Sequence, residues 1–247
     1  MSIDVTCLCL THGRPWLLAE AVESFRRQRL GGLTAELLVL NDCPEQTLTC
    51  GVPGVVIENM PAPVRDVSTK FNHGILRARG KWIAFWDDDD ISLPLRIADG
   101  VRLIGDKDAY RPTLCWNWGC GEIRYVGKPL LCQGMVRRDV SIAVGLCTSG
   151  EYNDKSLWDK IWPRLNSVQT TPRPQDMQYI YRWAGVGWHE SGAGEPDSAV
   201  RAEQFRRAAL ADPRFEAGEI EVVPAWRQEY GQMVWRAIGD GKGDIIR

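Results

Sequence analysis

Residues 78–90 read ARGKWIAFWDDDD, and this stretch carries the strongest information about fold and function. The apolar run from Trp82 to Trp86 follows a glycine and is typical of a buried strand. Buried strands of α/β proteins deliver their functional groups at their carboxyl ends. Four adjacent carboxylates, Asp87 to Asp90, follow at that end and repel one another. The stretch therefore predicts a strand that ends in a site for a cation.

Side chains alternate along extended backbone, so Asp87 and Asp89 are expected on one face. Two carboxylates on one side suit Mg²⁺ or Mn²⁺, with substrate phosphates completing the coordination shell. The simpler interpretation is a helix start, in which Asp90 or Ser92 caps a helix over Leu93–Ile104. That role for Asp90 or Ser92 leaves Asp87 and Asp89 available to a metal.

The composition sets broad limits. A chain of 247 residues can bury a full core, and its formal net charge of -2 comes without a basic run that would indicate a nucleic-acid arm. Neither a bilayer-spanning apolar stretch nor a signal-peptide start is visible, so a cytoplasmic protein without a transmembrane segment is expected. The 8 cysteines form no CxxC pair, which favours reduced, mostly buried thiols.

Apolar strands alternate with helical segments over the first hundred residues, which predicts βαβ units and a mainly parallel sheet. Strands are expected over residues 5–10, 35–40, 55–57 and 82–86, and helices over 16–29, 68–79 and 93–104. Farther along, strands are expected over 114–118, 122–126 and 219–223, and helices over 155–165, 175–183, 197–210 and 228–238.

Polar groups follow three of these strands: Thr11-x-x-Arg14, Asn41-Asp42 and Asp87-x-Asp89. In a parallel sheet their strand ends meet, so these groups would line one crevice. The glycine fingerprint of a Rossmann dinucleotide site is absent after the first strand, and the phosphate loop GxxxxGK[ST] is absent throughout. A nucleotide bound in this crevice would therefore have its phosphates held by a metal rather than by a glycine loop.

Several segments together resemble the family 2 glycosyltransferases of the GT-A fold. They are VTCLCLTHGRPWLL at 5–18, ELLVLND at 36–42, NHGI at 72–75 and the stretch at 78–90, and the resemblance covers about residues 3–104. It implies an α/β nucleotide-diphospho-sugar transferase fold, with a mainly parallel central sheet flanked by helices and a smaller carboxy-terminal acceptor-side region. Residues 1–104 would form the nucleotide-sugar-binding half with the DxD motif, 105–194 the acceptor and catalytic half, and 195–247 a helical extension of one globular unit.

The resemblance also implies a donor site and a metal site. Donor contacts would come from Thr11, Arg14, Asp42, Lys70, Asp87 and Asp88. The metal, Mn²⁺ or Mg²⁺, would be held by Asp89, Asp87 and His189. One departure concerns Phe71, which stands where the family often has Arg, so that Lys70 or Arg65 would supply the positive charge.

Gln175-Asp176 resembles the Glu-Asp pair of the family, with Gln175 replacing Glu, and makes Asp176 the candidate general base. Without the resemblance, Asp176 would be read as an acid at a helix start and His189 as a loop histidine. Trp188 lies beside His189 and is the best candidate for an aromatic side chain that stacks on the acceptor.

The implied function is an inverting, metal-dependent transfer of a sugar from a nucleoside-diphosphate donor to a hydroxyl acceptor. The acceptor remains open between a glycan, a lipid-linked sugar, a protein side chain, a metabolite and a modified nucleobase. One alternative is a metal-dependent nucleotidyl or phosphoryl transferase, although the turn at 11–15 lacks the glycine- and basic-rich loop usual in such enzymes. Another is a non-catalytic sugar- or nucleotide-binding module, with which Gln175 is compatible.

Overall fold

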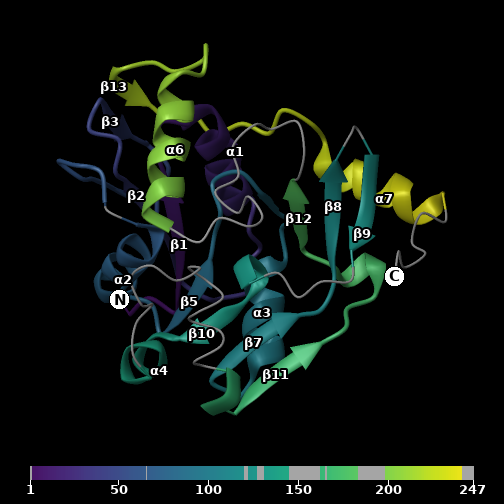
Figure 1. Cartoon of the computed structure of the whole chain (residues 1–247). Coiled ribbons are helices and arrows are strands. Elements are labelled where there is room, and N and C mark those ends of the chain that lie inside the picture. Colours follow the sequence, from purple (N-terminus) through teal and green to yellow (C-terminus); the bar gives the residue numbers. More distant parts are fainter. Residues whose placement is uncertain are drawn as a thin grey trace.

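The structure is a computed structural model that describes residues 2–64, 66–119, 122–126, 131–144, 162–164, 166–182 and 198–240. Its centre is a 7-stranded sheet with the order β11-β7-β10-β5-β1-β2-β4 (Figure 1). The expected strands of the first hundred residues are all present: β1 (Val5–Thr11), β2 (Ala35–Asn41), β4 (Val55–Asn59) and β5 (Trp82–Phe85). They pair in parallel, β1 with both β2 and β5, and β2 with β4. The predicted α/β fold with a mainly parallel sheet is confirmed.

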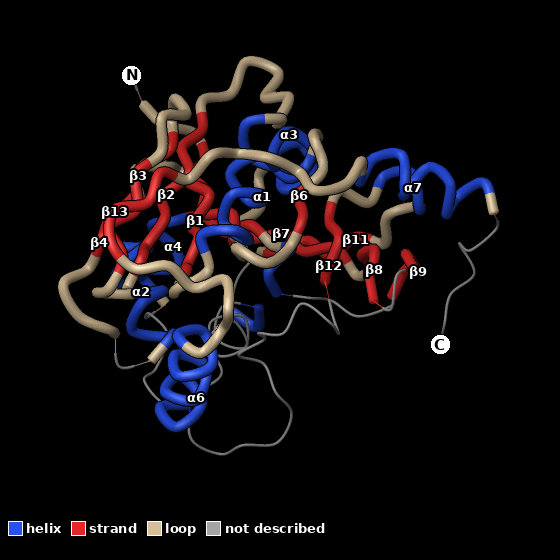
Figure 2. The backbone as a smooth tube through the Cα atoms, turned by 90° about the horizontal axis from the view of Figure 1, so that it is seen from above, coloured by secondary structure: helices blue, strands red, loops and turns tan. Residues whose placement is uncertain are grey.

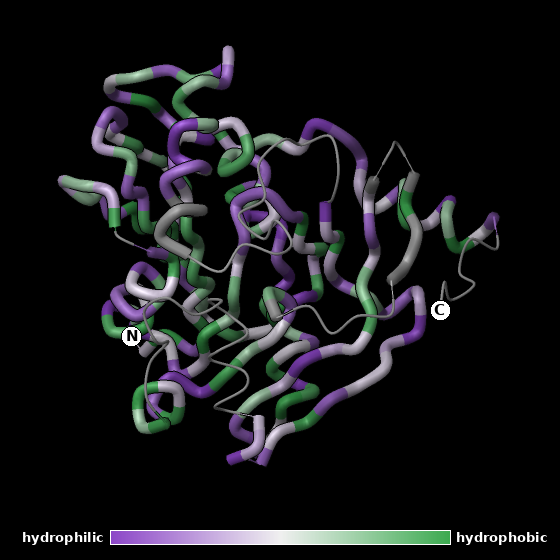
Figure 3. The backbone as a smooth tube through the Cα atoms, in the orientation of Figure 1, coloured by the Kyte–Doolittle hydropathy of each residue, from purple (hydrophilic) through white to green (hydrophobic). Residues whose placement is uncertain are grey.

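Three more strands extend the sheet beyond β5. The first, β10 (Met135–Arg137), runs antiparallel to β5 and to β7 (Ala109–Pro112). The outermost, β11 (Ser167–Thr170), is parallel to β7. In Figure 3 the apolar residues gather along the strands inside the molecule, as expected for a sheet that is covered on both faces.

Helices cover the two faces of this sheet. The helices α1 (Pro15–Arg26) and α3 (Arg96–Ile104) pack into one core with Val5, Trp82 and Trp86. The opposite face is covered by α2 (Val67–Arg77), while α4 (Arg138–Ala143) follows β10. Gly74 lets α2 approach β1 closely, because a Cβ atom at this position would lie 2.3 Å from a methyl group of Leu8.

A second sheet of 4 strands has the order β6-β12-β8-β9. Its members are β6 (Ile91–Ser92), β12 (Tyr179–Arg182), β8 (Cys115–Gly119) and β9 (Glu122–Val126). The antiparallel pair of β8 and β9 confirms the strands that were expected at 114–118 and 122–126. The helix α7 (Tyr230–Gly239) packs against this sheet. Figure 2 shows α7 at the right of the view and α6 (Ser198–Leu210) at the bottom.

The carboxy-terminal segment also pairs with the amino-terminal half. The short strand β13 (Gly218–Glu221) runs parallel to β3 (Gln46–Thr49), a strand that the sequence pattern missed. The remaining elements are the 3-10 turns η1 (Leu131–Gln133), η2 (Trp162–Arg164) and η3 (Pro174–Asp176). None of the helices in the described ranges is both long and apolar enough to cross a bilayer.

Two predicted helices differ from the structure. The helix expected over 175–183 is wrong: a single 3-10 turn, η3, is followed by the strand β12, in which Tyr179, Ile180 and Tyr181 favour extended backbone and pair with β6 and β8. The helix expected from residue 93 begins only at Arg96 and has no side-chain cap from Asp90 or Ser92, because residues 91–92 form β6. Of the helix expected over 155–165, only the turn η2 lies within the described residues.

Candidate active site

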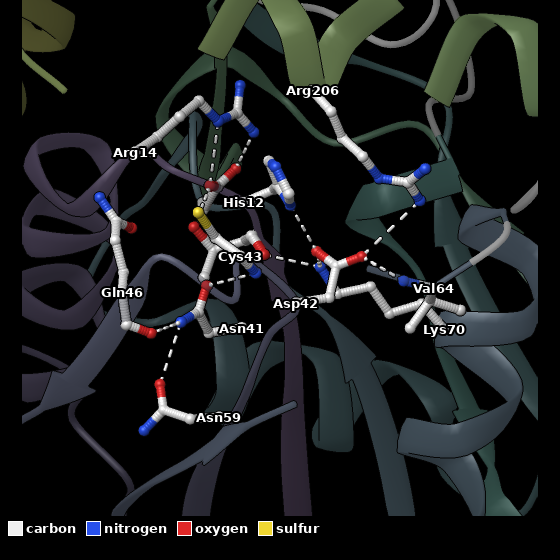
Figure 4. A network of polar contacts seen from close by, with 12 residues as sticks. His12, Arg14, Asn41, Asp42, Cys43, Gln46, Asn59, Val64, Lys70 and Arg206 are labelled. Carbon is white, nitrogen blue, oxygen red and sulfur yellow. Dashed lines mark hydrogen bonds and ion pairs between the residues drawn. The ribbon is translucent and has the colours of Figure 1, made fainter. Parts of the chain in front are cut away.

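Three parallel strands bring their polar ends together. Thr11, at the end of β1, lies opposite Asn41, at the end of β2, and Phe85, at the end of β5, pairs with Leu8 of β1. The segments that follow these strands therefore emerge at the same edge of the sheet. Figure 4 shows His12, Arg14 and Asp42 gathered at this edge, together with Lys70 from α2.

Arg14 holds one half of the acidic turn, which we define as residues 87–90. Its guanidinium donates through Nε and Nη2 to Asp88 and, across 3.2 Å, through Nη1 to Asp89 Oδ2. Thr11 Oγ1 donates to Asp88 Oδ2 at 2.7 Å. Burial disfavours the charge on Arg14, but Asp88 and Asp89 outweigh it and raise the pKa of the guanidinium. One guanidinium thus serves both carboxylates, and burial still raises the pKa of Asp88 despite the Arg14 charge.

Asp42 forms the second cluster. Its carboxylate accepts from Lys70 Nζ at 2.7 Å, lies 2.9 Å from His12 Nδ1 and accepts from the backbone N–H of Val64 at 2.9 Å. Burial alone would raise the pKa of Asp42, but the His12 hydrogen bond and the Lys70 charge outweigh it and hold the pKa well below its usual range. Lys70 also donates to the carbonyl of Thr11 at 2.6 Å and so ties the cluster to β1.

The other half of the acidic turn faces the second sheet. The Tyr179 hydroxyl contacts Asp87 Oδ2 at 3.3 Å and donates to Asp90 Oδ2. Asp90 Oδ1 accepts from the backbone N–H of Arg182 at 2.7 Å. Burial, together with the charges of Asp89 and Asp87, raises the pKa of Asp90 well above its usual range. Burial likewise raises the pKa of Tyr179, which therefore remains a hydrogen-bond donor.

The alternating-face prediction for the acidic turn is wrong. The strand β5 ends at Phe85, and residues 88–89 form a turn, so the period of two that holds for extended backbone does not apply. Asp88 and Asp89 share Arg14, whereas Asp87 and Asp90 share Tyr179. Asp88 is consequently a buried ion-pair partner and not a side chain on an opposite, unused face.

A buried ion pair between Arg182 and Glu20 packs against the acidic turn. Arg182 Nη1 donates to Glu20 Oε2 of α1 at 2.6 Å, and the Tyr230 hydroxyl of α7 donates to Glu20 Oε1 at 2.6 Å. Arg182 Nε donates to the carbonyl of Asp89. These contacts fix β12, and with it Tyr179, against the acidic turn.

The donor atoms around Asp87 fit a divalent cation in part. Oxygens of Asp87 and Asp90 and the sulfur of Cys132 lie within 4.8 Å of one another. The two carboxylates suit Mn²⁺ or Mg²⁺, whereas the sulfur is a softer donor than either ion prefers. Asp89 was expected to share the cation with Asp87. In the structure its Oδ2 atom accepts from Arg14.

The expected general base lies at a pocket. Asp176 is at the end of η3, and Arg173 Nε donates to its Oδ2 at 2.6 Å. Its side chain is 47% exposed. It lines an open pocket together with Asp99, Gln133 and Tyr179. Tyr179 is therefore common to this pocket and to the acidic turn.

Some expected site residues lie outside the described residues. These are Arg65, Trp188 and the proposed metal ligand His189. Other residues of the site escaped the sequence pattern. His12 stands in the same turn as Thr11 and Arg14 and could have been included on that ground, whereas Tyr179 was hidden by the wrong helix prediction. Cys132 and Arg206 have no local signal, because only the fold brings them to the site.

Comparisons with known proteins agree with this geometry. Residues 8–114 match the model of the family described as Glycosyl transferase family 2. Among solved structures, residues 1–349 of S. aureus TarS in complex with UDP-GlcNAc give a TM-score of 0.62 at 12% identity, over 87% of this chain and 68% of that chain. Mannosyltransferase PcManGT from Pyrobaculum calidifontis, in complex with GDP-Man and Mn²⁺, gives 0.53 at 14% identity, over 98% and 75%.

Another structure of S. aureus TarS gives a TM-score of 0.56 at 12% identity, and the match covers 73% of this chain but only 37% of that one. No curated protein gives a significant sequence match. At these identities the structural matches establish the fold alone, and the family match is confined to residues 8–114, which contain the acidic turn. Residues 8–114 are thus similar to glycosyl transferase family 2, and the protein has the GT-A fold of the glycosyltransferases TarS and PcManGT.

Proposed function

We propose that this protein transfers a sugar from a nucleoside-diphosphate donor to a hydroxyl acceptor, with inversion at the anomeric carbon and with a divalent cation. The observation that carries the proposal is the convergence of Thr11, Arg14, Asp42, Lys70 and the acidic turn at one edge of the parallel sheet. These residues come from four separate segments. All were expected in the donor site except Asp89, which was expected as a metal ligand, and Asp90, which was expected as a helix cap.

In this proposal, Asp42 and the Thr11 turn hold the nucleoside, and Lys70 supplies positive charge near the phosphates. Asp87, with Asp89 or Asp90, holds the cation, and His189 is kept as a further proposed ligand. The cation would stabilise the charge that develops on the leaving diphosphate. Asp88 keeps Arg14 in place and so positions the turn. The whole chain would act in one globular unit, with donor contacts before residue 105 and acceptor contacts after it.

Asp176 is the proposed general base. A base must reach the acceptor hydroxyl, and the pocket that Asp176 lines extends to Tyr179, which touches the acidic turn. Arg173 orients the carboxylate from outside. Bound in this pocket, an acceptor would present its hydroxyl between Asp176 and the donor, and Trp188 is kept as a proposed stacking residue.

The decisive experiment is a screen of nucleotide sugars with Mn²⁺ or Mg²⁺, beginning with UDP-GlcNAc and GDP-Man. We expect release of nucleoside diphosphate that depends on acceptor and metal, stops in EDTA and resumes with Mn²⁺. NMR of the glycoside would show the inverted anomeric configuration. Release of pyrophosphate or of nucleoside monophosphate would favour the nucleotidyl or phosphoryl transferase instead, and tight donor binding without turnover would favour a binding module.

The base is tested by Asp176→Asn, which retains side-chain size. Loss of a general base should reduce turnover by about 10²–10⁴-fold while donor affinity and melting temperature stay close to wild type. The matched control is Asp99→Asn, since Asp99 lines the same pocket and pairs with Arg102. Wild-type turnover in Asp176→Asn, or equal losses in both variants, would remove Asp176 from the mechanism.

A further inference from the structure

Arg206 reaches the site from an element far away in sequence. It lies on α6, well beyond the segment that matches the family model. Figure 4 shows its side chain pointing to the Asp42 carboxylate, next to Val64 and Lys70. The side chain is only 15% exposed, so its guanidinium is largely withdrawn from water. Such a charge is costly unless a close partner compensates it.

The carboxylates around Arg206 are occupied by closer partners. Arg206 lies 3.9 Å from Asp42 Oδ2 and 3.9 Å from Glu203 Oε2, too far in both cases for a hydrogen bond. Asp42 is held by Lys70 at 2.7 Å, and Glu203 is held by Arg207 at 2.8 Å. Each carboxylate thus has its own cation, and Arg206 contributes a positive charge in excess.

An excess guanidinium beside a nucleotide-binding carboxylate is suited to an anion. Its planar fork matches two oxygens of a phosphate, and the low exposure strengthens the attraction. The Lys70 ammonium lies on the same Asp42 carboxylate, so a phosphate bound by Arg206 would lie near a second positive charge. A bound anion would also compensate the buried charge of Arg206.

We propose that Arg206 binds a phosphate oxygen of the nucleotide donor, and that α6 is therefore a wall of the donor site. This inference rests on the proposed function for the identity of the ligand, a nucleoside diphosphate or its sugar ester. On binding, the guanidinium exchanges its two long contacts for a bidentate contact with the phosphate. The family-matched segment alone would then lack part of the donor site.

The test is calorimetry of UDP, GDP, inorganic pyrophosphate and uridine with Mn²⁺, using wild type, Arg206→Gln and the control Arg207→Gln. Arg207 neighbours Arg206 on the same helix, but its side chain is 77% exposed. We expect Arg206→Gln to weaken binding of the nucleotide that wild type prefers by about 10- to 100-fold, as for one charge-assisted hydrogen bond. Arg207→Gln should bind like wild type, and uridine, which has no phosphate, should bind equally to all three.

Arg206→Lys separates a binding role from a structural one. Lysine keeps the positive charge but lacks the planar, bidentate guanidinium. The nucleotide affinity of Arg206→Lys should therefore lie between those of wild type and Arg206→Gln. If Arg206→Gln folds poorly, the lysine variant replaces it, with an expected loss of about tenfold. Nucleotide affinity of Arg206→Gln equal to that of Arg207→Gln, or an equal loss for uridine, would overturn the inference.

The pyrophosphate arm keeps this inference separate from the proposed function. If wild type binds pyrophosphate but neither nucleotide, the proposed donor is wrong, and the anion site stands only if Arg206→Gln weakens pyrophosphate binding. If wild type binds no phosphate compound, both the proposed donor and the anion site are overturned.

Discussion

The two halves of the acidic turn each carry two carboxyl groups but differ in their partners. Asp88 and Asp89 face the Arg14 guanidinium, which compensates part of their charge within the protein. Asp90 accepts from the Tyr179 hydroxyl and from a backbone N–H, both uncharged, and Asp87 shares that hydroxyl. Buried carboxylates with neutral donors remain costly, whereas an ion-paired carboxylate stabilises the fold as long as its partner stays. The first half is thus suited to structure and the second to a cation.

The largest effect is expected for the half that faces Tyr179. Asp87→Asn removes a charged ligand while keeping the shape of the side chain, and should reduce turnover by about 10²–10³-fold, as for other lost electrostatic contacts to a transition state. Titration with Mn²⁺ should show weaker metal binding, and the melting temperature of the apoprotein should not fall. If Asp89→Asn shows this loss and Asp90→Asn shows none, the cation lies on the Arg14 side and the division between the halves is wrong.

The next effect is on stability and concerns the other half. Asp88→Asn breaks a buried pair with Arg14, which should lower the free energy of unfolding by about 3 kcal/mol, at the low end for such pairs because Asp89 remains. Urea denaturation measures this loss. The control is Asp99→Asn, whose exposed pair with Arg102 should be worth less than about 1 kcal/mol. Equal losses of unfolding free energy in the two variants would mean that the ion pair between Asp88 and Arg14 does not stabilise the fold more than an exposed pair does.

A smaller effect is expected for Tyr179→Phe, which removes the hydroxyl that touches Asp87 and Asp90. Loss of this buried donor should cost about 1–3 kcal/mol in the apoprotein. Saturating Mn²⁺ should restore part of the lost stability, because the cation can bind the carboxylate oxygens of Asp87 and Asp90 that the hydroxyl no longer contacts. Denaturation with and without Mn²⁺ provides the comparison, and a loss that Mn²⁺ leaves unchanged would separate Tyr179 from the metal site.

The smallest effect is expected in the pH dependence of stability, because protonation limits the cost of burying Asp90. The pKa of Asp90 is raised in the folded protein, so the folded state binds its proton more tightly than the unfolded state, whose value is about 3.9. Relative to Asp90→Asn, the wild-type apoprotein should lose stability as pH rises above about 3.9 until Asp90 ionises in the folded state. Parallel stability curves for the two proteins, measured without metal, would contradict this assignment.

The sequence predicted the donor half of the fold well because its signals are local. Each strand from β1 to β5 that was expected is an apolar run closed by a turn, and the polar groups at their ends meet because parallel strands align. The pairing of Lys70 with Asp42 follows from the same geometry, since α2 runs beside β1. Periodicity and strand order were sufficient for these residues.

The predictions that were wrong depend on tertiary context. Whether Asp87 lies with Asp89 or with Asp90 is decided by where β5 stops, and that point is set by pairing with β1 and not by composition. The segment after Asp176 has helical spacing, yet it becomes β12 because β6 and β8 offer strand partners on both sides. The positions of Cys132 and Arg206 follow only from the assembled fold.

The acidic turn has one more consequence, which concerns mechanics. It is one of the covalent connections between the two large sheets, since β5 before it belongs to the 7-stranded sheet and β6 after it to the 4-stranded sheet; the short link from β7 to β8 is another. The residues that carry the charges therefore also help to set the angle between the sheets. A hinge motion of one sheet against the other would change the contacts of Arg14 and Tyr179 with the turn. The electrostatics of the site and the relative orientation of the two sheets are therefore coupled at this point.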